Sequence, residues 1–147
     1  MENLYDVGRY LLSKTDDETG DFISNLKLQK LVYYAQGLNL ALYDEPLFEE
    51  ALEAWTYGPV VPDLYHHYKE FGSGCISPPA DFDVSVVSDQ AREVLDEVYQ
   101  VYGQFSGWKL RDMTHEESPW REAYAKKSFT KIISQASMKK HFLSQLN

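Results

Sequence analysis

The sequence predicts a mainly α-helical fold: a compact single-domain helical bundle over residues 1–147 with one short two-stranded β pairing. Three observations predict this fold. Apolar residues recur at spacings of three and four in several segments, as they do in amphipathic helices. The length of 147 residues suits one domain, and no internal repeat or low-complexity tract divides it. The composition, 44% hydrophobic and 25% charged, is close to that of an average soluble globular protein.

The N-terminal part is expected to form two helices. Leu4, Val7 and Leu11 predict a short helix that ends near Lys14, and a polar acidic loop follows over residues 15–21. Ser24 is the expected N-cap of a longer helix. Its main apolar stripe recurs at spacings of three and four: Leu28, Leu31, Ala35, Leu38 and Leu42. Because its other sides are also apolar, we expect this helix to be surrounded by other elements.

The middle of the chain alternates breaks and short elements. Asp44-Glu45-Pro46 ends the long helix, and residues 51–55 form either a short extended stretch or a helical turn before Gly58-Pro59. A helix is expected from Val60 to Phe71. Residues 72–87 contain Gly, Ser and a proline pair, which predicts a connection rather than a domain boundary.

The C-terminal part is expected to form several short helices. A helix over about residues 89–102 follows Ser88, and two shorter helices begin at Ser106 and Pro119. Residues 129–133 are a candidate strand that would pair with residues 51–55. A closing helix is expected after Ser134 or Ser137.

The charge is distributed unevenly along the chain. Residues 1–120 hold 8 basic and 22 acidic side chains, a net charge of -14, whereas residues 121–147 hold 6 basic and 1 acidic, a net of +5; together they give -9. This balance disfavours a surface that neutralises phosphates or coats an anionic membrane, so no nucleic acid or membrane partner is expected. A basic protein partner is expected, although acidic side chains also serve simply to keep a fold soluble.

Cysteine content and the N-terminus indicate a cytoplasmic protein. Cys75 is the single cysteine, so no intrachain disulfide can form, and no cationic neighbour in the sequence would activate its thiol. The N-terminus has neither the basic region nor the apolar core of a secretory signal. No stretch approaches the length of a membrane span.

No complete catalytic motif is present, so the chain is not expected to be an enzyme, and neither a cofactor nor a bound metal is expected. His66 and Glu70 could face the same way on one helix, and with His115 as a third ligand they would suit a small metal-dependent hydrolase. The sequence contains no HExxH-like spacing that would support this alternative.

Two polar and aromatic clusters allow two interpretations each. Residues 114–120 could hold a His-carboxylate acid/base pair, or they could form a helix junction in which His115 bonds a backbone carbonyl and Trp120 anchors the next helix. In the second interpretation Glu116 or Glu117 lies at the N-terminus of that helix. Residues 55–62 predict a rigid packed corner, in which an exposed Tyr57 would be a contact anchor.

Three blocks of the sequence resemble, in order, the conserved blocks of the Panacea domain family of SocA-like antitoxins and phage-associated GepA-like proteins. They are LKLQKLVYYAQG at residues 26–37, AWTYGPVVPDLY at residues 54–65 and THEESPW at residues 114–120. The resemblance extends from about Asn3 to Phe142. It implies one family domain across the chain and a non-enzymatic antitoxin that neutralises a cognate toxin by direct binding.

The resemblance also implies roles for partners and residues. A cytosolic ATP-dependent protease is a further expected partner if the chain acts as an adaptor, and a homo-oligomer is left open. A phage or prophage accessory regulator is the remaining alternative. The residues that match the family motifs are expected to hold the scaffold: Gln29, Lys30, Tyr33, Trp55, Gly58, Pro59, His115, Pro119 and Trp120. The acidic stretches at residues 16–21 and 44–53 are expected to steer a basic toxin, and the expected contact residues are Asp44, Glu45, Glu49, Glu50 and Tyr57.

Overall fold

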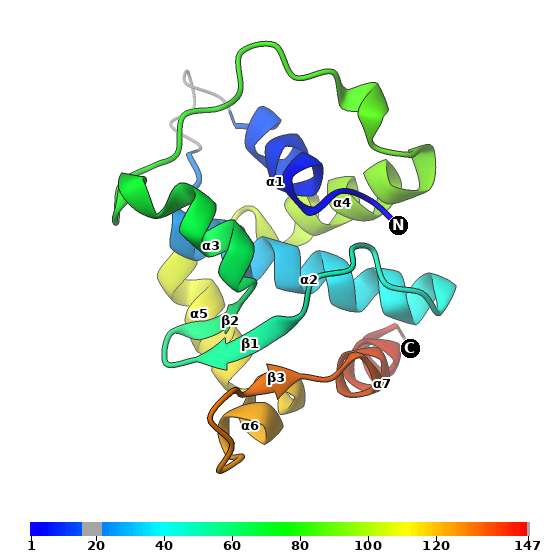
Figure 1. The fold of residues 1–147 in the computed structure, drawn as a ribbon. Helices are drawn as coiled ribbons and strands as arrows, with labels where there is room; N and C mark the ends of the chain where they lie inside the picture. The colour runs from blue at the N-terminus through cyan, green and yellow to red at the C-terminus, as the bar shows by residue number, and fades with distance from the viewer. Residues whose placement is uncertain (16–21, 147) are drawn as a thin grey trace.

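Helix α2 (Asn25–Tyr43) forms the centre of the molecule in a computed structural model that describes residues 1–15 and 22–146. Figure 1 shows α1 and α4 on one side of α2, and the β-sheet, α6 and α7 on the other. The mainly helical fold is confirmed. The described residues form these further α-helices: α1 (Leu4–Ser13), α3 (Pro62–Tyr68), α4 (Asp89–Tyr102), α5 (Gly107–His115), α6 (Ser118–Tyr124) and α7 (Gln135–Gln145). Two short 3₁₀ helices are η1 (Lys69–Phe71) and η2 (Val84–Val86).

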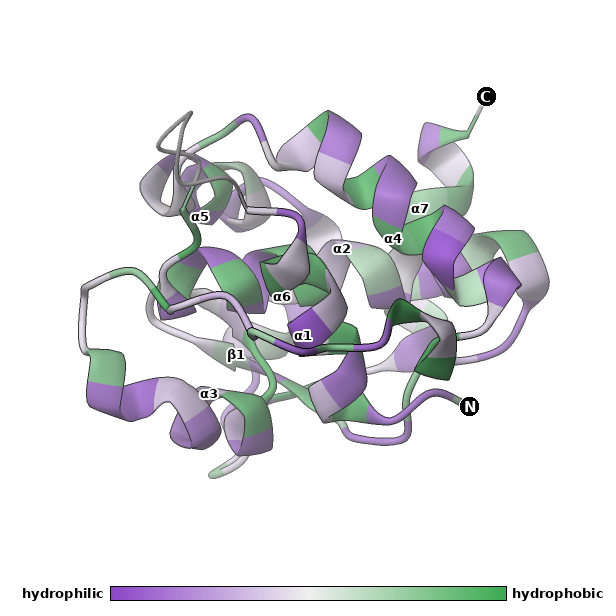
Figure 2. Ribbon diagram, turned by 90° about the horizontal axis from the view of Figure 1, so that it is seen from above, coloured by the Kyte–Doolittle hydropathy of each residue, from purple (hydrophilic) through white to green (hydrophobic). Residues whose placement is uncertain are grey.

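Helix α2 is buried on all its sides as far as Leu40, as its sequence predicts, whereas Leu42 of the expected apolar stripe is exposed. Every residue from Leu31 to Ala35 has no exposed surface. The outer helices are amphipathic by contrast, and Figure 2 shows hydrophilic and hydrophobic residues alternating along α4. Its buried residues are Ala91, Val94, Leu95 and Val98. The core is therefore built by wrapping half-polar helices around one central helix.

Polar side chains on α2 hold the chain that follows it. Gln36 Oε1 accepts a hydrogen bond from the Leu47 backbone N–H at 2.6 Å, and its Nε2 donates to the Phe48 carbonyl at 3.1 Å. Asn39 donates to the Glu45 carbonyl at 2.8 Å. Since buried backbone groups need partners, these amides let an irregular segment pack directly on the central helix.

Helix α7 packs closely on α2 because α2 has a glycine at the contact. A Cβ atom on Gly37 would lie 2.1 Å from the ring of Phe142. The Phe142 ring also makes edge contacts with Tyr33 and Tyr34. Only glycine at position 37 leaves room for this aromatic cluster.

The β-sheet has three antiparallel strands where the sequence predicted a pair. Strands β1 (Leu52–Trp55) and β3 (Ile132–Ile133) form the predicted pairing, so residues 51–55 are extended rather than helical. The strand that was not predicted is β2 (Gly58–Val60), which pairs with β1 across a two-residue turn. Pro59 is accommodated because β2 is an edge strand of the order β2-β1-β3.

Two predicted boundaries are wrong. The helix expected from Val60 begins at Pro62, because Val60 belongs to β2 and Val61, which precedes a proline, is extended. It is α-helical only to Tyr68 and continues as η1 to Phe71. The strand expected at residues 129–133 is reduced to its last two residues. The sequence pattern indicated these elements but not β2, the short strand between β1 and α3.

The predicted helix starts are confirmed at four serines. Each side-chain hydroxyl accepts a hydrogen bond from a backbone N–H three residues later. The capping residues are Ser24, Ser88, Ser106 and, of the two candidates for α7, Ser134. Asn3 caps α1 in the same way. No helix in the described parts of the chain is long and apolar enough to span a membrane.

Candidate partner-binding pocket

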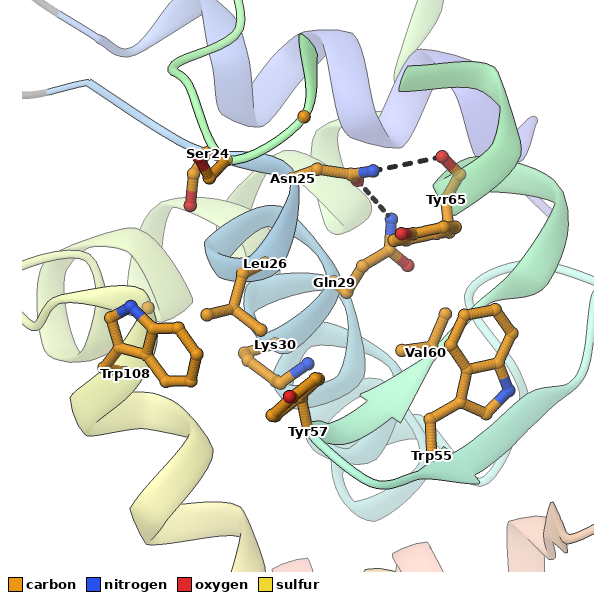
Figure 3. Close-up of a pocket in the computed structure, with 13 residues that line it drawn as sticks. Ser24, Asn25, Leu26, Gln29, Lys30, Trp55, Tyr57, Val60, Tyr65 and Trp108 are labelled. Carbon is orange, nitrogen blue, oxygen red and sulfur yellow. Dashed lines mark hydrogen bonds between the residues drawn. The ribbon is translucent and has the colours of Figure 1, made fainter. Parts of the chain in front are cut away.

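A pocket of about 330 Å³ opens beside the first turns of α2. Its walls come from α2, the β1–β2 hairpin, α3 and α5. The residues that line it are Ser24, Asn25, Leu26, Gln29, Lys30, Trp55, Tyr57, Val60, Tyr65, Gly72, Ser73, Gly107 and Trp108. Figure 3 shows Trp108 on one side, Trp55 and Tyr65 on the other, and the Lys30 amine between them. Mostly apolar walls with a few polar groups are typical of binding pockets.

A chain of amide hydrogen bonds fixes one wall of the pocket. Asn25 donates to the Tyr65 carbonyl at 3.0 Å and accepts from Gln29 at 2.9 Å (Figure 3). Gln29 Oε1 in turn accepts from the Val61 backbone N–H at 3.0 Å. These bonds join α2 to the end of the hairpin and to α3, so the wall is fixed before any partner arrives.

Lys30 is fully buried against this pocket. Its Nζ donates one hydrogen bond, to the Pro59 carbonyl, at 3.1 Å. Within the described part of the chain no carboxylate forms an ion pair with it. Burial lowers the pKa of Lys30 to about 7, because removing an ammonium group from water disfavours its charged form.

The hairpin approaches Lys30 closely because residue 58 is a glycine. Gly58 has a φ of +109°, and a Cβ atom there would lie 2.6 Å from Lys30 Cε and 3.0 Å from Thr114 Oγ1. Both its backbone conformation and the space around it therefore exclude a side chain. The Gly58-Pro59 corner is rigid, as the sequence predicted, and it covers the lysine.

Two exposed aromatic side chains form the rim of the pocket. Tyr57, in the hairpin turn, is 55% exposed, and Trp108, on α5, is 57% exposed. Their rings meet edge to face with centroids 5.7 Å apart, and the Arg111 guanidinium lies 5.1 Å from the Trp108 ring. Exposed aromatic rings beside a pocket are typical of surfaces that bind other proteins.

A second cluster, formed by His115 and Trp120, packs against the β1–β2 hairpin. The ring of His115 stacks on Trp120 with centroids 4.0 Å apart, and Trp120 Nε1 donates to the Trp55 carbonyl at 2.8 Å. Burial and the Arg111 charge lower the pKa of His115, while a hydrogen bond to the Thr56 backbone opposes them. This arrangement corresponds to a helix junction. Among the described residues, Glu117 bonds to Tyr33 and Tyr34 and Glu116 is exposed, so neither forms the alternative acid/base pair with His115.

Glu117 has a role that the sequence did not predict. It precedes α6, as expected, but its carboxylate does not cap that helix. Instead it accepts hydrogen bonds from the Tyr33 and Tyr34 hydroxyls, both at 2.9 Å. His141 Nε2 lies 3.9 Å from the same carboxylate. Burial raises the pKa of Glu117, and the two tyrosine hydrogen bonds oppose that rise.

The expected contact residues lie mainly on the segment after α2. Asp44, Glu45 and Glu49 are exposed, and Glu50 is partly buried. Asp44 forms an ion pair with Lys139 of α7, which links the acidic body to the basic C-terminal part. These acids do not line the Lys30 pocket, to which Tyr57 alone among the expected contacts contributes. The other expected acidic stretch, at residues 16–21, lies outside the described residues.

The residues proposed for a metal-dependent hydrolase do not come together. His66 is exposed and contacts the Trp55 ring, Glu70 is exposed in η1, and His115 stacks on Trp120. Across residues 1–15 and 22–146, no three His, Cys, Asp or Glu side chains form a group that could hold a metal ion. The hydrolase hypothesis therefore lacks its ligand set.

Comparisons with known proteins identify the family. A family model described as "Antitoxin SocA-like, Panacea domain" matches residues 28–121. The chain belongs to the Panacea-domain family of SocA-like antitoxins. Antitoxin SocA of Caulobacter vibrioides (strain NA1000 / CB15N) is 33% identical over 116 residues, and the match covers 67% of this chain and 58% of that protein. The comparison with solved structures found no match.

The Panacea match contains most of the pocket. It begins within α2, covers the hairpin, α3, α4 and α5, and ends inside α6. Lys30, Gly58 and Glu117 all lie within it, whereas α1 and α7 lie outside. The pocket is thus a feature of the part of the chain that defines the family.

Three important residues escaped the sequence analysis or were given a different role. Trp108 was assigned only to a helix, although a tryptophan between Gly107 and Lys109 is a signal of a surface contact. Lys30 was assigned to the scaffold, and its place in a helix apolar on all sides could have indicated a buried charge. The adjacent hydroxyls of Tyr33 and Tyr34 required an acceptor, which Glu117 supplies.

Proposed function

We propose that this chain is an antitoxin that neutralises a cognate protein toxin by binding it directly, without catalysis. The observation that carries the proposal is the match of residues 28–121 to a family of antitoxins. The chain spans 58% of the curated relative's length, so we do not assign that relative's partner to this chain. Direct binding is supported by the pocket with its exposed aromatic rim.

The rim offers a contact area suited to a protein partner. Tyr57 and Trp108 keep more than half of their surface exposed while their rings support each other. Large aromatic side chains of this kind contribute most to binding energy when a partner removes them from water. The toxin would therefore cover the rim and reach the pocket beneath it.

The acidic surface supports a basic toxin. Glu49 and Glu50 lie just before β1, and the carboxylates of this stretch would attract a positively charged partner over a distance of about 8 Å at physiological salt. Such charges mainly raise the rate of association.

Reversing two of these charges tests the steering role. We expect Glu49→Lys combined with Glu50→Lys to slow association with the toxin by about tenfold at low salt. The matched control is Glu93→Lys with Glu97→Lys, which makes the same charge change at exposed positions of α4. Stopped-flow association rates at several salt concentrations would measure both. Equal slowing by the two pairs would show that only net charge matters.

The direct test of neutralisation uses the product of the gene adjacent to this one. Co-expression should restore growth if that product is toxic. The two purified proteins should also form a complex, and the toxin should lose its activity in the absence of any protease. Restored growth without complex formation by the purified proteins would contradict direct binding.

A further inference from the structure

Two buried lysines on α2, one turn apart, have very different surroundings. Lys27 Nζ donates to the Gly103 carbonyl at 2.6 Å, just beyond the C-terminus of α4, where the helix dipole favours a positive charge. Among the described residues, Lys30 Nζ donates only to the Pro59 carbonyl, at 3.1 Å, and this carbonyl belongs to a strand and not to a helix C-terminus. An ammonium group has three donors. Lys30 therefore has hydrogen-bonding capacity and charge that the described residues do not satisfy.

No acidic side chain is among the described residues that line the pocket beside Lys30. Its polar lining consists of hydroxyls and amides, and the amides of Asn25 and Gln29 are already bonded to each other and to the backbone. Around them lie Trp55, Tyr65, Val60 and Leu26. A buried charge without a counter-ion is costly, and an incoming anion would remove that cost.

We propose that the Lys30 pocket receives a carboxylate of the toxin, carried next to an apolar or aromatic side chain. The carboxylate would pair with the Lys30 ammonium, and the apolar group would pack between Trp108 and Trp55, which face each other across the pocket in Figure 3. This inference rests on the proposed antitoxin function and names the chemistry of its contact.

The exposed rim favours a protein segment over a free small molecule. Pockets for small ligands bury most of the ligand within their own walls. Here Tyr57 and Trp108 extend beyond the pocket and remain more than half exposed. A larger partner that inserts one acidic segment into the pocket would also cover both rings. The rings and the pocket would then form one binding surface.

The proposal predicts that binding takes up a proton. Lys30 is only partly charged near neutral pH, because burial lowers its pKa to about 7. A bound carboxylate favours the charged form, so affinity should fall as the pH rises above about 7. The other titratable groups around Lys30 are Tyr57 of the hairpin and Tyr65 of α3, which line the same pocket, and His115 of α5. The charges of Arg111 and Asp112 act on His115 in turn.

Replacing each lysine by methionine separates binding from folding. Lys30→Met keeps an unbranched side chain, one heavy atom shorter, and removes the buried charge, so the variant should be at least as resistant to denaturant as the natural chain. Its affinity for the toxin should fall by about tenfold or more, and the pH dependence above pH 7 should disappear. The control Lys27→Met should be less stable but should bind the toxin normally once folded.

A small probe tests the pocket without the toxin. N-acetylphenylalanine carries a carboxylate beside an aromatic ring, and its amide lacks the charge. We expect the acid to bind about tenfold more tightly than the amide, seen as shifts of the Trp55 and Trp108 indole N–H signals, and Lys30→Met to abolish the difference.

The outcomes distinguish the two proposals. If the natural chain fails to bind the toxin while the probe prefers the carboxylate, the antitoxin proposal fails and the pocket assignment stands. If Lys30→Met binds the toxin as tightly as the natural chain, the toxin contact proposed here is overturned. If the chain binds the acid and the amide equally, or neither of them, the pocket does not recognise carboxylates.

Discussion

Helix α2 contributes to two buried polar sites that are built in opposite ways. Near its middle, Tyr33 and Tyr34 both donate to the carboxylate of Glu117, and all three groups belong to this chain. One turn earlier, Lys30 is also buried, but the described residues give it a single carbonyl partner and an adjacent pocket. The comparison suggests that a buried group whose partners are internal holds the fold, whereas one with spare capacity is available to a ligand.

The Glu117 site should show the largest effect on stability. Glu117→Ala leaves two buried tyrosine hydroxyls without an acceptor, and we expect the free energy of unfolding to fall by about 3 kcal/mol. Glu117→Gln keeps an acceptor oxygen and should lose about 1 kcal/mol. Guanidinium denaturation would measure both. If the two variants were equally stable, the tyrosine hydrogen bonds would not be holding the fold.

The Lys30 site depends on the close approach of the hairpin, which a glycine pair can test. Gly58→Ala introduces both backbone strain and a collision with Lys30 Cε, and we expect a loss of about 2 kcal/mol. Gly72→Ala is the matched control, because Gly72 also has a positive φ, +56°, but no atom lies within 4 Å of its Cβ position. It should lose about 1 kcal/mol, from strain alone. An equal loss at both positions would mean that the collision costs nothing.

The pH dependence of stability compares the two sites directly. The pKa of Lys30 is about 7 in the folded chain and ordinarily 10.5, so the unfolded chain binds more protons between these values. Stability should therefore rise with pH, by about 2 kcal/mol between about pH 7 and pH 9. Lys30→Met should lack this rise.

The shifted groups near Lys30 and Glu117 have pKa values that move away from the range of pH 7 to pH 9. Burial lowers the pKa of His115 and raises those of Tyr33 and Tyr34, which moves all three away from it. The raised pKa of Glu117 acts with the opposite sign at lower pH, since its folded form holds the proton longer. A flat stability profile between pH 7 and pH 9 would show that Lys30 keeps an ordinary pKa in the folded chain.

The sequence predicted the helices well because helices are set by local patterns. Apolar spacing located α2, and serine hydroxyls marked the starts of α2, α4, α5 and α7. It missed β2, since a three-residue strand that contains Pro59 has no periodicity of its own and exists only through pairing with β1. Local pattern therefore fixes the elements that need no distant partner.

The candidate site was harder to predict because it depends on contacts between distant parts of the chain. The sequence singled out Tyr57 and the Gly58-Pro59 corner, and both lie at the pocket. It could not show that Trp108, some fifty positions later, would meet Tyr57. It also assigned Glu117 to a helix end, because its tyrosine partners lie 83 and 84 positions away. The family motifs include Tyr57, the Gly58-Pro59 corner and Glu117, but not Trp108, and they do not indicate which residues hold the fold and which face a partner.

The most direct test of the central claim is the pKa of the Lys30 amine, measured by NMR titration of the free chain and of its complex with the toxin. We predict a pKa of about 7 in the free chain and a clear rise in the complex, because a carboxylate then lies beside the ammonium. The Lys27 amine, held at the end of α4, serves as the internal reference and should not change. An unchanged Lys30 pKa in a fully formed complex would contradict the claim that the toxin supplies its counter-ion.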